Sequence, residues 1–474
     1  MELSLDRIFF KQLGLSDLEI DRLLPNWCKA KAWAQISERD MCAAAQRCSE
    51  FWNLELKGIR KCIMAYIYEL IEAARMSEYK DRGDKLLYGN MPVHPACMIA
   101  NRIAGKGKLH VCHPEFLIHV VHNAFLCKSE VNKQDEALMS KKCRHCGMNA
   151  SRINAFVSGR MVLPDAMWNW GFMCNEGFKT DEMLQCMLGP GWHSVISTLP
   201  HDSYAQSTEA DDLERVKRLA AAIEAGQDEV TSYTGIPVSK QDLCLAIDEL
   251  NMYTKKISEL TDLVCTADPQ PLTGAELSLF SLPLGMSFDT GFENLVDAID
   301  TTIAEVKELI NAGKGVLPKG APKMGCYFTP CCVPWVCDAF TREGINLSIN
   351  TFHGKLSKIY KAFDREFPYE AVARQWLSQP NAVNMENQAG IIEDMMADYP
   401  VDAMLYGFFA FDRWIGALQK TTSQIVEERT GVPHYYMEGD FWNDIRFMDG
   451  DKKNLISGIA HQLKVRKIYS GGTE

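Results

Sequence analysis

Apolar residues recur at helical spacing along the first part of the chain, most clearly from Met41 to Phe51 and from Ile59 to Ala74. The stretch Met91-Pro92-Val93-His94-Pro95 then interrupts the pattern, because proline lacks the backbone donor that a helix interior needs. We therefore predict an N-terminal helical segment over residues 1–90.

Between residues 91 and 207, short apolar runs alternate with segments of helical periodicity. The predicted strands are 109–112, 167–173 and 194–198, and the predicted helices are 115–126, a run through Ala155 that follows the Cys143/Cys146 loop, and 180–188. Such alternation is typical of a parallel α/β sheet, so this stretch is predicted to form a first lobe.

Residues 208–322 return to a helical pattern, with predicted helices over 209–225, from Ser239 onward, and over 293–312. Asp242 stands three positions after Ser239, which is the spacing of a capping box. Gly313, Gly315, Pro318, Gly320 and Pro322 then indicate a linker. We expect a helical insert between two lobes.

The last segment, residues 323–474, has the clearest alternation of strands and helices. Its predicted strands are 325–329, 345–350, 403–409 and 433–437, and its predicted helices are 333–342, 413–430 and 453–462. The fold class is therefore α/β, with two doubly wound parallel-sheet lobes of the Rossmann or flavodoxin-like kind. Ligands of such lobes bind beyond the carboxyl ends of the strands, so we expect a cleft between two facing edges.

Composition narrows the possible partners. The chain has 474 residues, 47% of them hydrophobic and 24% charged, and no apolar run approaches the ~20 residues that cross a bilayer. With no signal-like start, we expect a cytoplasmic protein that binds no membrane. The net charge of −12 disfavours nucleic acid as a partner, whereas local lysines and helix N-termini still suit a small anion.

The chain contains seventeen cysteines. In a reducing cytosol these cysteines are poorly suited to form disulfides. Eight of them lie in apolar or helical contexts, where a free cysteine is usually a small buried hydrophobe: Cys28, Cys42, Cys48, Cys62, Cys97, Cys186, Cys244 and Cys265. Metal or redox chemistry is the better explanation for some of the others.

Cys143 and Cys146 have the two-residue gap that lets two thiolates reach one metal. A structural zinc site needs a second close pair, and Cys331-Cys332 with Cys337 lacks the usual spacing. Cys146 and Cys174 each fall on a loop at the predicted cleft, and an iron–sulfur cluster accepts such dispersed ligands. The pattern favours a cluster over zinc, and it leaves Cys331 and Cys332 open as ligands or core residues.

The histidines and the search for known short motifs do not change this interpretation. His110, His113, His119 and His122 lie close together, but no acidic residue at a matching helical position completes a metal set, so we interpret them as structural. The chain has no GxGxxG, Walker A or GxSxG motif, which removes the usual support for dinucleotide, ATP or serine-hydrolase chemistry.

The segment Cys146-Gly147-Met148-Asn149-Ala150-Ser151 resembles the first cluster-cysteine motif of the 2-hydroxyacyl-CoA dehydratase and benzoyl-CoA reductase family. Leu163-Pro164-Asp165 followed by Cys174-Asn175 resembles the second motif. Segments 322–344, 402–419 and 431–446 resemble the family's second lobe in order and spacing, so the resemblance covers roughly residues 90–465.

This resemblance implies a [4Fe–4S] cluster with Cys146 and Cys174 as ligands. The family's third cysteine is absent here, since Phe409-Ala410-Phe411-Asp412-Arg413-Trp414 stands in its place. Several alternatives follow from this difference. The third ligand is Cys332 or Cys331 from the neighbouring strand end, or it is Asp412. Otherwise the cluster is unusual or absent. Cys143 is an extra thiol that fits a larger cluster, such as a double-cubane cluster, and Pro92-Val93-His94 replaces the family's Pro-X-Glu.

The resemblance also implies a homologous second subunit, in a heterodimer or homodimer, and an ATP-hydrolysing iron–sulfur activator protein. The implied function is that of the iron–sulfur subunit of a 2-hydroxyacyl-CoA dehydratase, a lyase that reduces an acyl-CoA thioester by one electron before water is lost. Two alternatives remain: a subunit of a benzoyl-CoA reductase-type or double-cubane reductase, and a cluster-free, non-catalytic partner subunit.

Overall fold

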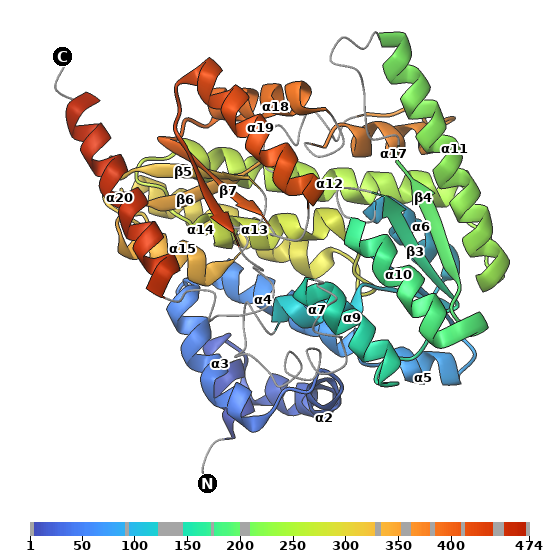
Figure 1. Ribbon diagram of the computed structural model, residues 1–474. Helices are drawn as coiled ribbons and strands as arrows, with labels where there is room; N and C mark the ends of the chain where they lie inside the picture. Colours follow the sequence, from blue (N-terminus) through green and yellow to red (C-terminus); the bar gives the residue numbers. More distant parts are fainter. Residues whose placement is uncertain are drawn as a thin grey trace.

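A computed structural model describes residues 4–90, 94–121, 146–171, 175–199, 209–327, 333–351, 362–379, 384–408, 413–438 and 450–470. Within these ranges the chain is mostly helical and contains two four-stranded parallel sheets (Figure 1). The predicted α/β class with two parallel-sheet lobes is confirmed. No helix in these ranges combines the length and apolar character that crossing a bilayer requires.

The chain begins with five helices: α1 Leu5–Gln12, α2 Asp17–Trp33, α3 Glu38–Phe51, α4 Lys57–Ala73 and α5 Met76–Asp81. Serine side chains accept from backbone N–H groups at the starts of α1, α2 and α3, and α2 and α3 each have a full capping box. Helix α4 is buried almost throughout, because it packs on the first lobe and on the insert.

The first lobe consists of β1 Lys85–Gly89, α6 Pro95–Gly105, β2 Leu109–Cys112, α7 Pro114–Val120, α9 Gly147–Val157, β3 Ala166–Gly171, α10 Asn175–Leu188 and β4 Ser194–Thr198. Its strand order is β2-β1-β3-β4, with every pair parallel. Strands β2, β3 and β4 match the predicted ones. Strand β1 lies inside the range expected to be helical, which is a correction to the sequence-based prediction.

The insert consists of α11 Glu209–Thr234, α12 Lys240–Thr266, α13 Gly274–Ser281 and α14 Glu293–Asn311. The predicted capping box at Ser239 and Asp242 is present. Helix α12 packs on α6 of the first lobe, and α13 packs on β6 of the second (Figure 1). The insert therefore bridges the two lobes.

The second lobe consists of β5 Lys323–Tyr327, α15 Pro334–Arg342, β6 Asn346–Asn350, α17 Pro368–Leu377, α18 Met385–Asp398, β7 Ala403–Phe408, α19 Arg413–Thr430, β8 His434–Glu438 and α20 Gly450–Ser470. Its strand order, β6-β5-β7-β8, repeats the order of the first sheet. In both sheets the order reverses between the first and third strands, which is the usual place for a ligand in an open α/β sheet.

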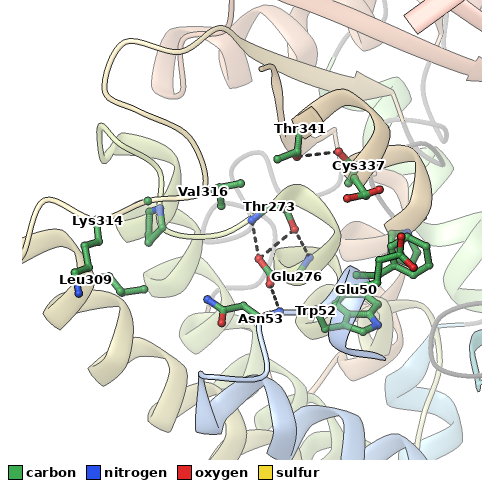
Figure 2. A pocket seen from close by; sticks show the side chains of 15 residues that line it. Glu50, Trp52, Asn53, Thr273, Glu276, Leu309, Lys314, Val316, Cys337 and Thr341 are labelled. Atoms are coloured by element: carbon green, nitrogen blue, oxygen red, sulfur yellow. Dashed lines mark hydrogen bonds between the residues drawn. The ribbon is translucent and has the colours of Figure 1, made fainter. Parts of the chain in front are cut away.

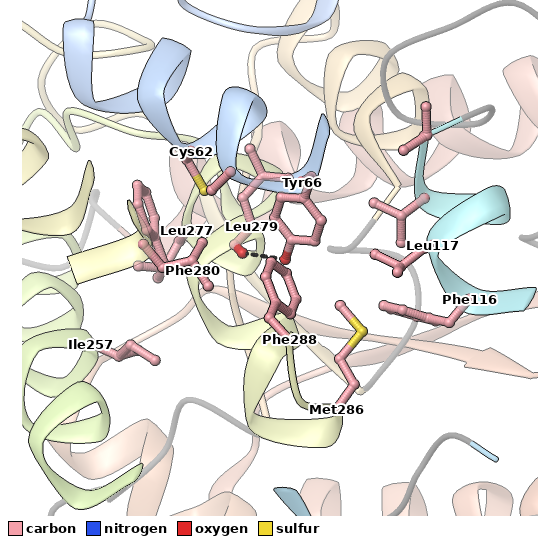
Figure 3. Packing of buried hydrophobic residues seen from close by; sticks show 14 of the residues in the cluster. Cys62, Tyr66, Phe116, Leu117, Ile257, Leu277, Leu279, Phe280, Met286 and Phe288 are labelled. Carbon is pink, nitrogen blue, oxygen red and sulfur yellow. Dashed lines mark hydrogen bonds between the residues drawn. The ribbon is translucent and has the colours of Figure 1, made fainter. Parts of the chain in front are cut away.

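One hydrophobic core joins the N-terminal helices to the first lobe and the insert (Figure 3). Tyr66 of α4 packs edge-on against Phe288, and its hydroxyl donates to the carbonyl oxygen of Leu279 at 2.7 Å. Phe116 and Leu117 of α7 belong to the same core (Figure 3). Helix α7 is therefore anchored from one side, while its other side faces α9.

Candidate functional site

Cys146 stands at the start of α9, where the sequence predicted a thiolate. It is the N-cap residue of the helix, in an extended conformation, and it is only 6% exposed. The side-chain amide of Asn149 donates to its sulfur at 3.3 Å. A sulfur at this position faces the positive end of the helix dipole and receives a hydrogen bond, and both features favour a thiolate.

Helix α7 holds the first residue of α9 in place. Nε2 of His119 lies 2.6 Å from the carbonyl oxygen of Gly147, so Nε2 carries the proton and donates it. His119 is itself buried, and α7 is anchored in the core shown in Figure 3. The backbone that carries Cys146 is thus fixed by a neighbouring helix, as a preorganised ligand requires.

Arg152, in the second turn of α9, links this helix to the start of α10. Its side chain is fully buried, and its Nη2 donates to the carbonyl oxygen of Gly177 at 3.0 Å. A Cβ at Gly177 would lie 2.4 Å from Nδ2 of Asn90, so glycine is needed for this close approach. Asn90 directly follows β1, and these contacts place Arg152 near the carboxyl edge of the sheet.

Two buried histidines near the carboxyl edge of the first sheet carry no charge. His94 caps α6, and its Nδ1 accepts from the backbone of Ala96; burial lowers its pKa to about 3. Burial likewise lowers the pKa of His113, at the start of α7, to about 3. The rings of Trp170 and Trp376 pack against His94, which brings α17 of the second lobe onto this edge. Both histidines are therefore neutral, and the edge is shielded by aromatic rings.

The other predicted sulfur ligands, Cys143, Cys174, Cys331 and Cys332, lie outside the described residues. So do Phe409 to Asp412, where the family cysteine is missing. Cys174 immediately precedes Asn175, the first residue of α10, just as Cys146 immediately precedes α9. The role of these four cysteines stays a prediction.

The eight cysteines predicted to be core residues divide into two groups. Cys48, Cys62, Cys97, Cys244 and Cys265 are buried, as predicted, whereas Cys28, Cys42 and Cys186 are exposed. Burial raises the pKa of Cys48 and Cys265 to about 12, so these thiols are protonated at neutral pH. The three exposed thiols correct the prediction, because each lies on the outer face of an amphipathic helix.

Carboxylates gather around His110, which the sequence analysis had left without an acidic partner. Ligand atoms of Glu72, His110 and Asp289 lie within 4.8 Å of one another. Nδ1 of His110 contacts Asp289 at 2.7 Å, and Arg75 pairs with Glu72 at 3.0 Å. Because histidine and arginine already occupy these carboxylates, we interpret the group as a structural cluster.

A crevice of about 420 Å³ lies between α3, the start of α13, the end of α14 with the residues that follow it, and α15 (Figure 2). Its buried carboxylate, Glu276, accepts from the backbone N–H groups of Asn53 and Thr273. Asp338 at its rim pairs with Arg342 at 2.7 Å. Both acidic groups thus already have partners, and none of the residues that line the crevice belongs to α9.

Comparison with protein families decides the chain's relationship. The family model of the 2-hydroxyglutaryl-CoA dehydratase D-component matches residues 111–456, which is most of the chain. The chain belongs to this family. The match includes Cys146 and Arg152, together with the four other predicted ligands. It begins after β1 and His94. No curated protein matches the chain.

The described part of the site suits the iron–sulfur cluster that the resemblance implies. Cys146 offers a soft, buried sulfur donor at a helix N-terminus, which is a typical cluster ligand. Nε and Nη1 of Arg152 are buried and have no hydrogen-bond acceptor within the described part of the chain. An anionic group at this edge would satisfy them, and a cluster held by thiolates is such a group.

Proposed function

We propose that this chain is the iron–sulfur subunit of a 2-hydroxyacyl-CoA dehydratase-type enzyme, with a [4Fe–4S] cluster at Cys146, Cys174 and Cys332 or Cys331. The family match over residues 111–456 carries the proposal, because the matched region contains Cys146, a buried thiol at the N-cap position of α9. Cys143 is the spare thiol close to this set. The substrate class is an acyl-CoA thioester, and the reaction is the loss of water from it.

When bound, the cluster would supply one electron to the thioester carbonyl, which promotes loss of the hydroxyl group, and would take the electron back after a proton has left. Cys146 would hold the group from the start of α9, and Asn149 would orient the sulfur through its 3.3 Å hydrogen bond. His119 fixes the backbone at Gly147. Trp170 and Trp376 exclude water from the neighbouring edge, which protects reactive species from side reactions.

The proposal includes two partners. A homologous second subunit would complete the enzyme, since the family is that of a dehydratase component. An ATP-hydrolysing activator with its own cluster would deliver the electron. Neither a membrane nor a nucleic acid is part of this scheme, and the net charge of −12 is consistent with that.

Anaerobic purification followed by iron and sulfide analysis tests the proposal. We expect a brown protein with about four irons per chain whose colour bleaches in air. A colourless, iron-free protein that also fails to load iron and sulfide in vitro would overturn the proposal and favour the cluster-free partner subunit. Eight irons per chain would instead indicate the double-cubane reductase. Assays with a 2-hydroxyacyl-CoA and with benzoyl-CoA, in the presence of activator and ATP, then separate dehydratase from reductase.

A further inference from the structure

Arg152 is a buried cation whose hydrogen-bonding capacity is mostly unused. Its side chain is fully buried, and only Nη2 has an acceptor, the carbonyl oxygen of Gly177. Nε and Nη1 have none among the residues described. Buried donors are nearly always paired in native proteins, and an unpaired buried charge is strongly unfavourable. A buried cation with free donor atoms suits an anionic partner.

Two acidic residues of this lobe, Asp165 and Asp181, already have partners. Asp165 pairs with Lys85 and accepts from the backbone of Leu86. Asp181 on α10 accepts from Nε1 of Trp192 at 2.8 Å and from the hydroxyl of Ser194. Asn90, whose Nδ2 lies close to Gly177, is uncharged. Within the described ranges, no carboxylate forms an ion pair with Arg152.

The position of Arg152 connects it with both predicted cluster ligands. It lies in the second turn of α9, the helix whose N-cap is Cys146, and the side chains of helical residues point back toward the N-terminus. Its guanidinium reaches the first turn of α10, the helix that begins directly after Cys174 in the sequence. Arg152 therefore links the two helices that follow the two cysteines in the chain.

We propose that Arg152 is the buried counter-charge of the anionic cluster. The inference rests on the proposed function and adds to it a residue that is not a ligand. A cluster bound by thiolates carries net negative charge, and reduction makes that charge more negative. A nearby buried cation favours the reduced state and raises the reduction potential. In the cluster-free protein the same cation is expected to be destabilising, because no carboxylate in the described ranges forms an ion pair with it.

The test compares wild type with Arg152→Met, which keeps the shape but loses the charge, and with Arg152→Lys, which keeps the charge. Arg47→Met is the control, since Arg47 is also buried but stacks on Phe51 and Trp335, far along the chain from α9. For each protein, the melting temperature is measured before and after anaerobic loading with iron and sulfide. The midpoint potential of the loaded form is measured by a redox titration followed by electron paramagnetic resonance.

We expect loading to raise the melting temperature of wild type and Arg152→Lys more than that of Arg152→Met. The midpoint potential of Arg152→Met should be more negative than that of wild type, whereas Arg152→Lys and Arg47→Met should stay close to it. Equal loading increments and equal potentials in all four proteins would overturn the inference and leave the proposed function intact. A wild-type protein that takes up no cluster would overturn both.

Discussion

Two polar regions of the molecule, one around Glu69 and one around Arg152, differ in how completely their charged groups are paired. In the cluster of Glu69, Glu72, His110 and Asp289, each carboxylate accepts from at least two donors. At the Cys146 edge, Arg152 keeps two buried nitrogens without acceptors among the described residues. A network whose carboxylates are all paired holds elements together, whereas a buried cation with unpaired donors suits an anionic ligand.

The largest effect on stability is expected for a substitution of Glu69, in the cluster around His110. Glu69 of α4 accepts from the backbone N–H groups of Asp289 and Thr290 and from the Thr290 hydroxyl. Glu69→Ala leaves these donors unpaired and should lower the free energy of unfolding by about 3 kcal/mol. Chemical denaturation of the cluster-free protein measures it. The control is Glu78→Ala, which removes an exposed ion pair with Lys29 and should change the free energy of unfolding by less than about 1 kcal/mol. Similar losses of stability in the two variants would contradict the comparison.

The same residue predicts a loss of stability toward alkaline pH. Burial, and after it the nearby Asp289 carboxylate, raise the pKa of Glu69 from 4.5 to about 8. The folded state therefore binds this proton more tightly than the unfolded state, and stability should fall as pH rises from about 4.5 through about 8. Glu69→Gln should flatten this dependence in melting curves between pH 5 and 9. An unchanged slope would show that Glu69 is already ionised at pH 5.

Low pH should reduce the stability of the protein through the buried histidines near Cys146. The pKa of His113 is lowered from 6.5 to about 3 by burial, so the unfolded state binds the proton more tightly. Its contribution to stability is present above pH 6.5 and is lost as pH falls toward about 3. His113→Gln should therefore reduce the acid sensitivity of the melting temperature. If wild type and variant lose stability in parallel, His113 is protonated in the folded state.

Asn149 should have the smallest effect. Asn149→Ala removes the 3.3 Å hydrogen bond to the Cys146 sulfur and should cost the cluster-free protein about 1 kcal/mol. The loaded variant should keep its iron and show a slightly more negative midpoint potential, by less than Arg152→Met. Iron analysis and the redox titration check both points. Complete loss of iron would mean that Asn149 is essential for binding rather than for tuning.

The sequence predicted most strands because their apolar runs are bounded by clear breaks. Strand β4 and helix α19 have the predicted bounds. Strand β1 was missed, since Lys85-Leu86-Leu87-Tyr88-Gly89 is short, follows a helix closely and has no alternation of its own. Its identity as a strand comes from pairing with β2 and β3, which is non-local information.

The candidate site was predictable only in its local part. The place of Cys146 at a helix start follows from adjacent residues, and the structure confirms it. The acidic partner of His110 is 179 positions away in the chain, so a search along one helix face missed it. The burial of Arg152 likewise depends on the packing of α10 against α9. No periodicity or motif in the sequence carries that information.

Iron loading of three proteins side by side tests the central claim most directly. Wild type, Cys146→Ala and Asp289→Asn are loaded anaerobically with iron and sulfide, and bound iron is determined after desalting. The account predicts that wild type and Asp289→Asn bind about four irons per chain, while Cys146→Ala loses most of its iron. Equal loading of Cys146→Ala and wild type, or loss of iron in Asp289→Asn alone, would contradict it.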